Sequence, residues 1–302
     1  MKHVVVMPAH NEAAYIGRTL QSLAGQTRRP DRVIVVDDGS TDTTPETVRQ
    51  FSVMHDWITL VPGSTGEGRR YRVVEVFNHG YSRVRSEEFT YISKIDADLV
   101  FPDNYFEVLF DVMDADPTIG AAGGVLEEVT ASGRKIRLRM PDNHVPGPIK
   151  TIRKSVFDEM GGFVPMLGWD IVDLVQIRSL GYRTACLPQL SVLHLRRTAA
   201  ATGILRGNVR MGHGAYVIGT HPLFALARSL YRMFEPPYIL AGAALGYGYF
   251  RSWLKRAEQI SDAGLIRALR EEQLYRLFHF NKLPRRSRSP GPGAPRTGTP
   301  IL

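Results

Sequence analysis

The sequence has 302 residues, 43% of them hydrophobic and 23% charged, a composition typical of a globular chain that can bury a sizeable core. Its formal net charge of +8 at pH 7 favours anionic partners, such as phosphate-bearing substrates or a lipid surface. We recognise no DNA- or RNA-binding module, so nucleic acid is not expected as a partner. Cys186 is the only cysteine, which excludes an intrachain disulfide and a zinc site made of several thiolates.

The beginning of the chain predicts a cytoplasmic protein. Met1 and Lys2 lead directly into a short apolar run, without the long apolar core and cleavage site of a secretory signal. A single cysteine and the lack of any Asn-x-Ser/Thr sequon agree with that expectation.

Strands and helices are predicted to alternate from residue 3 to about residue 125. The apolar runs predict strands near 3–7, 32–36, 57–61 and 90–95. The segments between and after them predict helices near 13–24, 43–54, 71–84 and 103–114. This alternation predicts an α/β fold with a Rossmann-like, mostly parallel sheet flanked by helices.

The pattern changes after Gly124. A strand-like run over 125–140 is followed by a loop over 141–148. Helices are predicted near 153–160 and 170–180, and strands near 183–187 and 190–194. Residues 203–280 have a helical pattern, and 284–302, dominated by Arg, Ser, Pro, Gly and Thr, are expected to be a disordered basic tail.

The segment 236–250 contains no charged residue and is rich in aromatic side chains. It is shorter than the roughly 20 apolar residues that a membrane-spanning helix needs. Arginines and lysines flank it on both sides, which suits an anionic membrane surface. A buried helix and an oligomer contact are the alternatives, and the sequence does not indicate an oligomeric state.

Three of the predicted strands end abruptly in polar residues. Residues 10–12 follow the first strand, 37–42 follow the second, and Asp96 and Asp98 follow the fourth. The carboxyl ends of parallel strands meet at one edge of a sheet, so these groups are expected around a shared crevice. Side chains two apart in an extended backbone point to the same side, so Asp96 and Asp98 can converge on Mg or Mn. The alternative is a pair of solvated turn residues.

Taken together, these motifs resemble the family 2 glycosyltransferases, which have the GT-A fold. The resemblance runs from about Val4 to about Arg197, and the order of its motifs is specific. In chain order they are Pro8–Glu12, Val35–Asp42, Asp96–Asp98, Gly161–Phe163, Trp169–Asp170, Gly181–Arg183 and His194.

The resemblance implies a division of the chain into a catalytic domain and appendages. Residues 1–200 would form the GT-A domain, in which 1–125 bind the nucleotide-sugar and 126–200 supply the acceptor side. A helical extension over 201–283, for which membrane association and burial are the alternatives, and the tail over 284–302 would follow.

The resemblance also implies roles for the residues at the strand ends. Pro8, His10 and Glu12 would line the nucleoside pocket, and Asp38 would contact the nucleobase or ribose rather than only cap a helix. Asp96 would lie near the ribose and the metal, and Asp98 would coordinate Mn or Mg. His194 would add an imidazole ligand or serve a structural role. A glycine-rich loop precedes Arg69, which would reach the donor phosphates or remain solvated.

The general base is implied at Gly168-Trp169-Asp170. Family members usually carry a glutamate before this aspartate, and here the glutamate is absent. Asp170 is the candidate base or a helix cap. Asp173, one turn later on the same face, is the reserve. Trp169 would form an apolar wall for a sugar ring, or belong to the core.

The predicted activity is an inverting, metal-dependent transfer of one sugar from a UDP- or GDP-linked donor. The acceptor would be a glycan or a lipid-linked molecule in cell-envelope or exopolysaccharide synthesis, at the cytoplasmic face of the membrane. The Gln-x-x-Arg-Trp motif of processive polymerases is absent. A polyprenyl-phosphate sugar synthase and a non-catalytic, nucleotide-binding partner of a glycan synthase are the alternatives.

Overall fold

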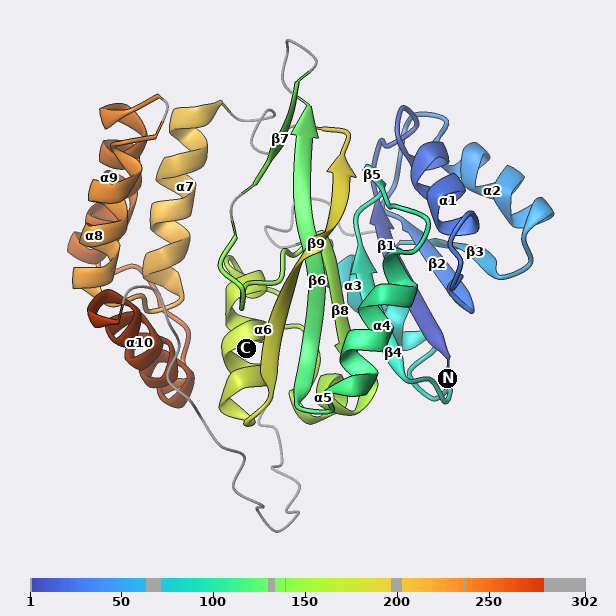
Figure 1. Ribbon diagram of the computed structural model, residues 1–302. Coiled ribbons are helices and arrows are strands. Elements are labelled where there is room, and N and C mark those ends of the chain that lie inside the picture. The colour runs from blue at the N-terminus through green and yellow to red at the C-terminus, as the bar shows by residue number, and fades with distance from the viewer. Residues whose placement is uncertain are drawn as a thin grey trace. The chain divides into compact units, whose positions relative to one another are not determined.

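Figure 1 presents a computed structural model, which describes residues 2–63, 72–129, 134–138, 140–196, 203–235 and 237–279. The chain divides into two compact units, each with its own hydrophobic core. The sheet unit comprises Met1–Met166 and Tyr182–Arg197. The helical unit comprises Leu167–Gly181 and Thr198–Leu302.

The first half of the sheet unit confirms the predicted alternation of strands and helices, with bounds that differ by a few residues. Its strands are β1 (His3–Ala9), β2 (Arg32–Asp37), β3 (Ile58–Pro62) and β4 (Tyr91–Ile95). Its helices are α1 (Ile16–Ala24), α2 (Thr44–Met54), α3 (Arg72–Ser82) and α4 (Tyr105–Ala115). These four strands pair in parallel, in the order β3-β2-β1-β4.

Both faces of these strands are buried, which explains their nearly continuous apolar sequences. Val5 and Val33 point to one face and pack in the main core with residues of α1, α2 and α4. Val6 and Val36 point to the other face, where α3 packs so closely that a Cβ on Gly80 would lie 2.7 and 2.6 Å from them. Only the strand ends are therefore left to meet a ligand.

The second half of the sheet unit differs from the prediction. It contains β5 (Leu99–Val100), β6 (Ile119–Val129), β7 (Lys135–Arg137), β8 (Ile149–Arg153), α5 (Lys154–Glu159) and β9 (Arg183–His194). The predicted run over 125–140 is wrong in its bounds, because β6 begins six residues earlier in a buried stretch of small residues. The two strands predicted over 183–194 are one continuous strand, β9.

These strands complete a single mixed sheet, shown in Figure 1. From β4 onward the order continues β8-β6-β9-β5, and β7 pairs with β6. Strand β8 is antiparallel to β4 and β6, whereas β6 and β9 are parallel. Strand β9 therefore carries His194 to the same edge of the sheet as the end of β6, beside the β4–β5 turn.

The helical unit consists of helices, as predicted for residues 203–280. They are α6 (Trp169–Ser179), α7 (Ile204–Val217), α8 (Pro222–Arg232), α9 (Ile239–Leu254) and α10 (Ala263–Phe278). Helices α7 and α9 approach backbone to backbone, since a Cβ on Gly248 would lie 2.1 Å from the carbonyl oxygen of Val209. None of the helices in the described ranges has both the length and the apolar character needed to span a bilayer.

His3, at the start of β1, makes the free energy of unfolding depend on pH. Its ring is buried between Phe106 and Phe110, and Nε2 lies 2.7 Å from the Ser93 hydroxyl. Burial, aided by the charge of Arg28, lowers the pKa of His3 from 6.5 to about 3. The unfolded chain therefore takes up a proton at a pH where the folded chain does not, so stability is lost as the pH falls from 6.5 towards 3.

We expect the free energy of unfolding to fall by up to about 2 kcal/mol between pH 6.5 and pH 4.5 because of this residue. Urea unfolding followed by tryptophan fluorescence measures the effect. A His3→Gln variant should lose that part of the pH slope, whereas His279→Gln, at an exposed position, should retain it. Equal slopes in the native protein and His3→Gln would contradict the assignment.

Candidate active site

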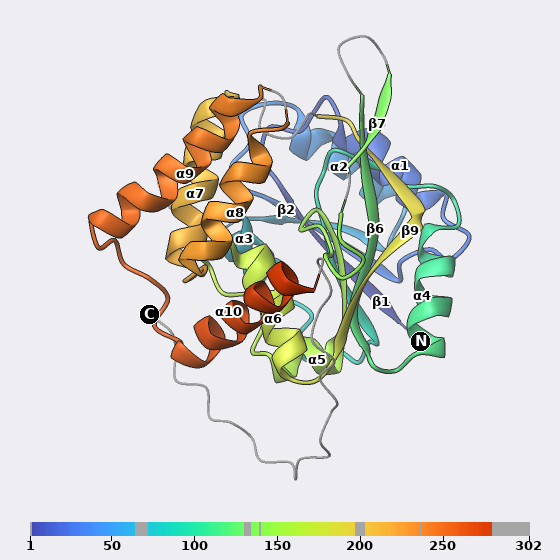
Figure 2. The same cartoon turned by 60° about the vertical axis from the view of Figure 1, so that its left-hand side comes forward.

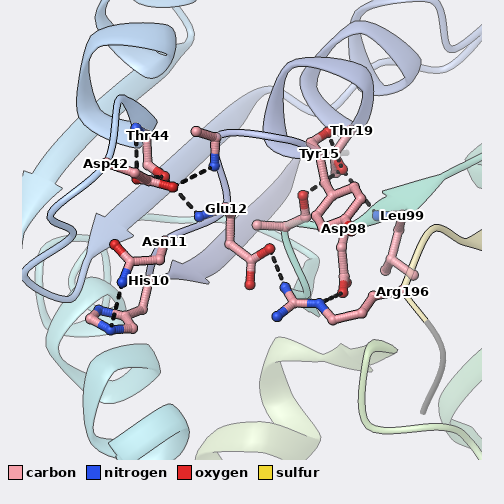
Figure 3. Close-up of polar contacts among 12 residues, drawn as sticks. His10, Asn11, Glu12, Tyr15, Thr19, Asp42, Thr44, Asp98, Leu99 and Arg196 are labelled. Atoms are coloured by element: carbon pink, nitrogen blue, oxygen red, sulfur yellow. Dashed lines mark hydrogen bonds and ion pairs between the residues drawn. The ribbon is translucent and has the colours of Figure 1, made fainter. Parts of the chain in front are cut away.

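The ends of β1 and β2 are held together as one structural element. Asn11 adopts a left-handed conformation with φ of 55°, which turns the chain away from β1. Its side-chain oxygen accepts a hydrogen bond from the backbone N–H of Thr41 at 2.8 Å, and its own N–H donates to the Ser40 hydroxyl at 2.9 Å. Figure 3 shows the neighbouring contacts, in which Thr44 and Asp42 accept from the backbone N–H groups of Glu12 and Ala13, in the loop before α1. The two loops thus form a fixed rim along the carboxyl edge of the sheet.

Asp38 lies in this rim with one carboxylate oxygen engaged and one available. The side chain is buried, and its Oδ2 forms an ion pair with Arg72 at the start of α3. Its Oδ1 is also buried but has no hydrogen-bond partner within the part of the chain that the structure describes. Nδ1 of His10 lies 2.9 Å from the Asp38 carbonyl oxygen. Gly63 passes so close that a Cβ there would lie 2.7 Å from the Asp37 carbonyl. Asp38 therefore presents a buried acceptor suited to a ligand's hydroxyl or N–H group.

Asp98 and His194 form the buried centre of the site. The antiparallel pairing of β5 with β9 sets Leu99 opposite His194, which brings Nε2 of the imidazole to 3.3 Å from Asp98 Oδ2. Burial opposes ionisation of both groups, but their mutual attraction outweighs it. The pKa of Asp98 is consequently lowered and that of His194 is raised. The contact between the two groups therefore favours the aspartate form of Asp98 and the imidazolium form of His194.

Arg196 is a member of the site that the sequence analysis missed. Its Nε donates to Asp98 Oδ2 at 3.2 Å, and its Nη2 forms an ion pair with Glu12. Figure 3 shows the guanidinium lying between the two carboxylates, and it also lies 5.4 Å from the centre of the Tyr15 ring. Burial raises the pKa of Glu12, and Arg196 counteracts that rise. Arg196, two positions beyond His194 in the chain, thus compensates the charge of one buried carboxylate, Asp98, and one partly buried carboxylate, Glu12.

Asp96 and Asp98 do not lie in one extended strand, which the prediction of their convergence had assumed. Residues 97 and 98 form a turn between β4 and β5, so the rule for alternating side chains does not apply. Asp96 forms an ion pair with Lys94, and its side chain is 31% exposed against 9% for Asp98. Its charge nevertheless acts on His194 and on Glu12, so it lies in the neighbourhood of the pair.

The donor set fits a divalent cation that is shared with a substrate. No group of three or more His, Cys, Asp or Glu side chains suited to a metal occurs in the described ranges. Asp98 and His194 are nevertheless adjacent, and they offer one carboxylate and one imidazole. Mg or Mn commonly takes one or two protein ligands and completes its shell with phosphate and water. Metal binding would require the imidazole of His194 to be neutral.

The remaining predicted donor residues differ in how well they are placed. Pro8 lies in β1 opposite Val36 of β2, one residue before the strand ends. Arg69 lies outside the described residues. Arg72, three positions later, is the described cation of that region, and it bonds Asp38.

The predicted acceptor residues belong to the helical unit. Gly168 precedes α6 with φ of 81°, and Trp169 and Asp170 form the first turn of that helix. Asp170 is partly exposed and interacts with the charge of Arg228 from α8. Asp173 is buried, and its Oδ1 accepts a hydrogen bond from the Leu174 N–H at 2.6 Å. Burial makes Asp173 the less accessible of the two carboxylates.

Comparisons with known proteins agree with this arrangement. The family Glycosyl transferase family 2 matches residues 4–167. The probable glycosyltransferase YdaM of Bacillus subtilis (strain 168) is 27% identical over 214 residues, which cover 61% of this chain and 48% of YdaM. The chain therefore spans about half the length of that relative.

Two solved structures share the fold. One, GalNAc-T7 with UDP, GalNAc and Mn²⁺, superposes with a TM-score of 0.60 at 15% identity, covering 94% of this chain and 58% of that one. Another, the mannosyltransferase PcManGT from Pyrobaculum calidifontis with GDP-Man and Mn²⁺, gives a TM-score of 0.54 at 19% identity, with coverages of 88% and 78%. These likenesses show the GT-A fold. Since the family match covers more than half of its length, the chain belongs to glycosyltransferase family 2.

Proposed function

We propose that this glycosyltransferase moves one sugar from a UDP- or GDP-linked donor to a glycan or lipid-linked acceptor, with inversion at the anomeric carbon. The observation that carries the proposal is the cluster of Asp38, Glu12, Asp98 and His194 at one carboxyl edge of the sheet. The related structures named above hold UDP or GDP-Man together with Mn²⁺, which supports the same donor class here.

The donor nucleoside is assigned to the rim formed by the ends of β1 and β2. Oδ1 of Asp38, which has no hydrogen-bond partner among the described residues, would accept a hydrogen bond from the nucleobase or the ribose. Pro8, His10 and Glu12 would line the same pocket, with Asp96 near the ribose. Arg69 would contact the donor phosphates.

The diphosphate is assigned to the Asp98 side of the cluster. Asp98 and His194, with Asp96 nearby, would hold Mn or Mg, which offsets the negative charge that builds on the departing diphosphate. Arg196 would supply a further positive charge at the same place, since it already lies between Glu12 and Asp98. Both features lower the cost of breaking the bond between the sugar and the diphosphate.

The acceptor hydroxyl is assigned to Asp170 as general base. In an inverting transfer the acceptor oxygen forms a bond to the anomeric carbon as the bond to the diphosphate breaks, and the hydroxyl proton passes to the base. Trp169 beside it would form an apolar wall for a sugar ring. Asp173 remains the reserve, although its burial argues against it.

We expect Asp170→Asn to lower kcat by about a hundredfold to ten-thousandfold, with little change in the KM for the donor, because an amide cannot accept the proton. Steady-state assays of nucleoside diphosphate release measure both constants. Asp173→Asn should keep kcat within about threefold. If both variants transfer sugar at the native rate, neither aspartate is the base.

The acceptor is proposed to belong to cell-envelope or exopolysaccharide synthesis at the cytoplasmic face of the membrane. The basic and aromatic segment 228–256 supports an acceptor presented at an anionic surface. A screen of the purified chain against a panel of nucleotide sugars, scored for released diphosphate with and without Mn, tests the proposed function. Release that depends on one donor and on the metal is expected. Binding of nucleotide without turnover of any donor would favour a non-catalytic partner of a glycan synthase.

A further inference from the structure

The helical unit exposes large apolar side chains along α8, α9 and the segment that joins them. On α8, Leu223, Leu226 and Leu230 are exposed, at spacings of three and four residues that align them along one helix face. The series continues past the end of the helix to Phe234, which is 81% exposed. The other exposed large apolar residues of this region are Tyr231, Tyr238, Ile239, Leu240, Tyr247, Trp253 and Leu254.

The interface between α8 and α9 uses small residues, which explains why the large ones are exposed. Ala225 and Ser229 of α8 are buried, and a Cβ on Gly242 of α9 would lie 2.3 Å from the Ser229 carbonyl oxygen. Figure 2 shows the two helices side by side. Small residues between the helices and large apolar residues around them are typical of helices that pack within lipid. A helix of 16 residues, such as α9, is too short to span a bilayer and suits its interface.

The charge of α8, α9 and their neighbouring residues indicates which kind of membrane surface they would bind. Residues 222–256 contain five arginines and lysines and one acidic residue, Glu235, which gives a net charge of +4. Arg251, Lys255 and Arg256 at the end of α9 are exposed. A net charge of +4, against +8 for the whole chain, therefore lies in the 35 residues that also carry the apolar face. A second copy packing by the same face would bring two such positive segments together, which opposes self-association.

We propose that α8, α9 and the segment between them form a docking face for the interface of a bilayer that contains anionic lipids. The leucine stripe and the aromatic side chains enter the boundary between head groups and acyl chains, and the arginines and lysines contact anionic head groups. This inference deepens the proposed lipid-linked acceptor and rests on the proposed function only for its biological purpose, since vesicle binding requires no donor. A protein that transfers sugar but does not bind vesicles would overturn this inference and leave the proposed function standing.

Vesicle co-sedimentation of the full chain tests the inference. Vesicles of phosphatidylcholine with phosphatidylglycerol should bind the native chain at least tenfold more strongly than pure phosphatidylcholine, and added salt should weaken the binding. A triple variant, Phe234→Ser, Ile239→Ser and Leu254→Ser, should lose at least tenfold in the vesicle partition coefficient. These side chains are 81%, 68% and 74% exposed, so their removal should leave the thermal unfolding temperature close to native.

Matched controls distinguish binding through this face from non-specific binding to vesicles. Val53→Ser with Met54→Ser, on α2 of the sheet unit, removes side chains that are 89% and 64% exposed and should leave binding within twofold of native. Arg251→Gln, Lys255→Gln and Arg256→Gln together should weaken binding to anionic vesicles, whereas Arg83→Gln with Arg85→Gln in the sheet unit should not. Brominated acyl chains should quench the native fluorescence, and Trp253→Phe should lose most of that quenching.

Three results would overturn the inference. One is a native chain that binds neither kind of vesicle. Another is a Phe234, Ile239 and Leu254 variant that binds as the native chain does, since the binding would then lie elsewhere. The third is a native dimer, seen by light scattering, that the same variant converts to monomer without any vesicle binding. That result would assign the face to a second copy.

Discussion

Replacing Asp98 by asparagine is expected to lower kcat about a thousandfold while the fold is retained. Asp98 is the carboxylate that both His194 and Arg196 contact, and it is the most buried acid of the cluster around Glu12. Removing its charge would weaken the hold on a divalent cation and leave the leaving diphosphate with less stabilisation, an effect worth about 4 kcal/mol in the transition state. Diphosphate release at saturating donor measures the change in kcat.

A second measurement tests whether the loss of activity follows from weaker binding of the metal. Binding of Mn, followed by the electron paramagnetic resonance signal of the free ion, should weaken at least tenfold in Asp98→Asn. Asp111→Asn, at an exposed position on α4, should bind Mn and turn over donor as the native chain does. Native activity in Asp98→Asn at limiting Mn would remove the cation from the mechanism, and with it the role proposed for Asp98.

The donor side of the site could be predicted from the sequence because it depends on local patterns. Continuous apolar runs such as Val33–Val36 identify strands buried on both faces, and their polar endings identify the ligand edge. The resemblance added His194. Parallel pairing of β1 with β2 then brings residue 9 opposite residue 37, so the two loops must meet.

Arg196 could not be predicted in the same way, because its role depends on contacts distant in the sequence. It pairs with Glu12, 184 positions earlier, and with Asp98, 98 positions earlier. The missed strand β8 has a similar cause. Antiparallel partners on both sides bury even its Lys150, so tertiary pairing rather than local propensity makes it a strand. The turn at residues 97 and 98 likewise follows from the need to begin β5 beside β9.

The helical unit contains a buried ion pair that neither composition nor periodicity indicates. Arg178 of α6 and Glu272 of α10 form two parallel hydrogen bonds, from Nε to Oε1 at 2.9 Å and from Nη2 to Oε2 at 2.8 Å. Both side chains are buried. Burial and the charge of Arg178 lower the pKa of Arg276, and Glu272 counteracts that effect. One carboxylate therefore compensates two arginines.

Glu272→Gln is expected to destabilise the helical unit by about 3–5 kcal/mol, because it removes the carboxylate that pairs with the buried guanidinium of Arg178 and offsets the charge of Arg276. Urea unfolding followed by circular dichroism measures the loss. The double variant Arg178→Met with Glu272→Leu removes both charges and should recover most of the stability, since a buried ion pair contributes little over apolar side chains of similar volume. Glu271→Gln, at the exposed neighbouring position, should change the free energy of unfolding by less than about 0.5 kcal/mol. A double variant as unstable as Glu272→Gln would instead mean that the pair itself stabilises the packing of α6 against α10.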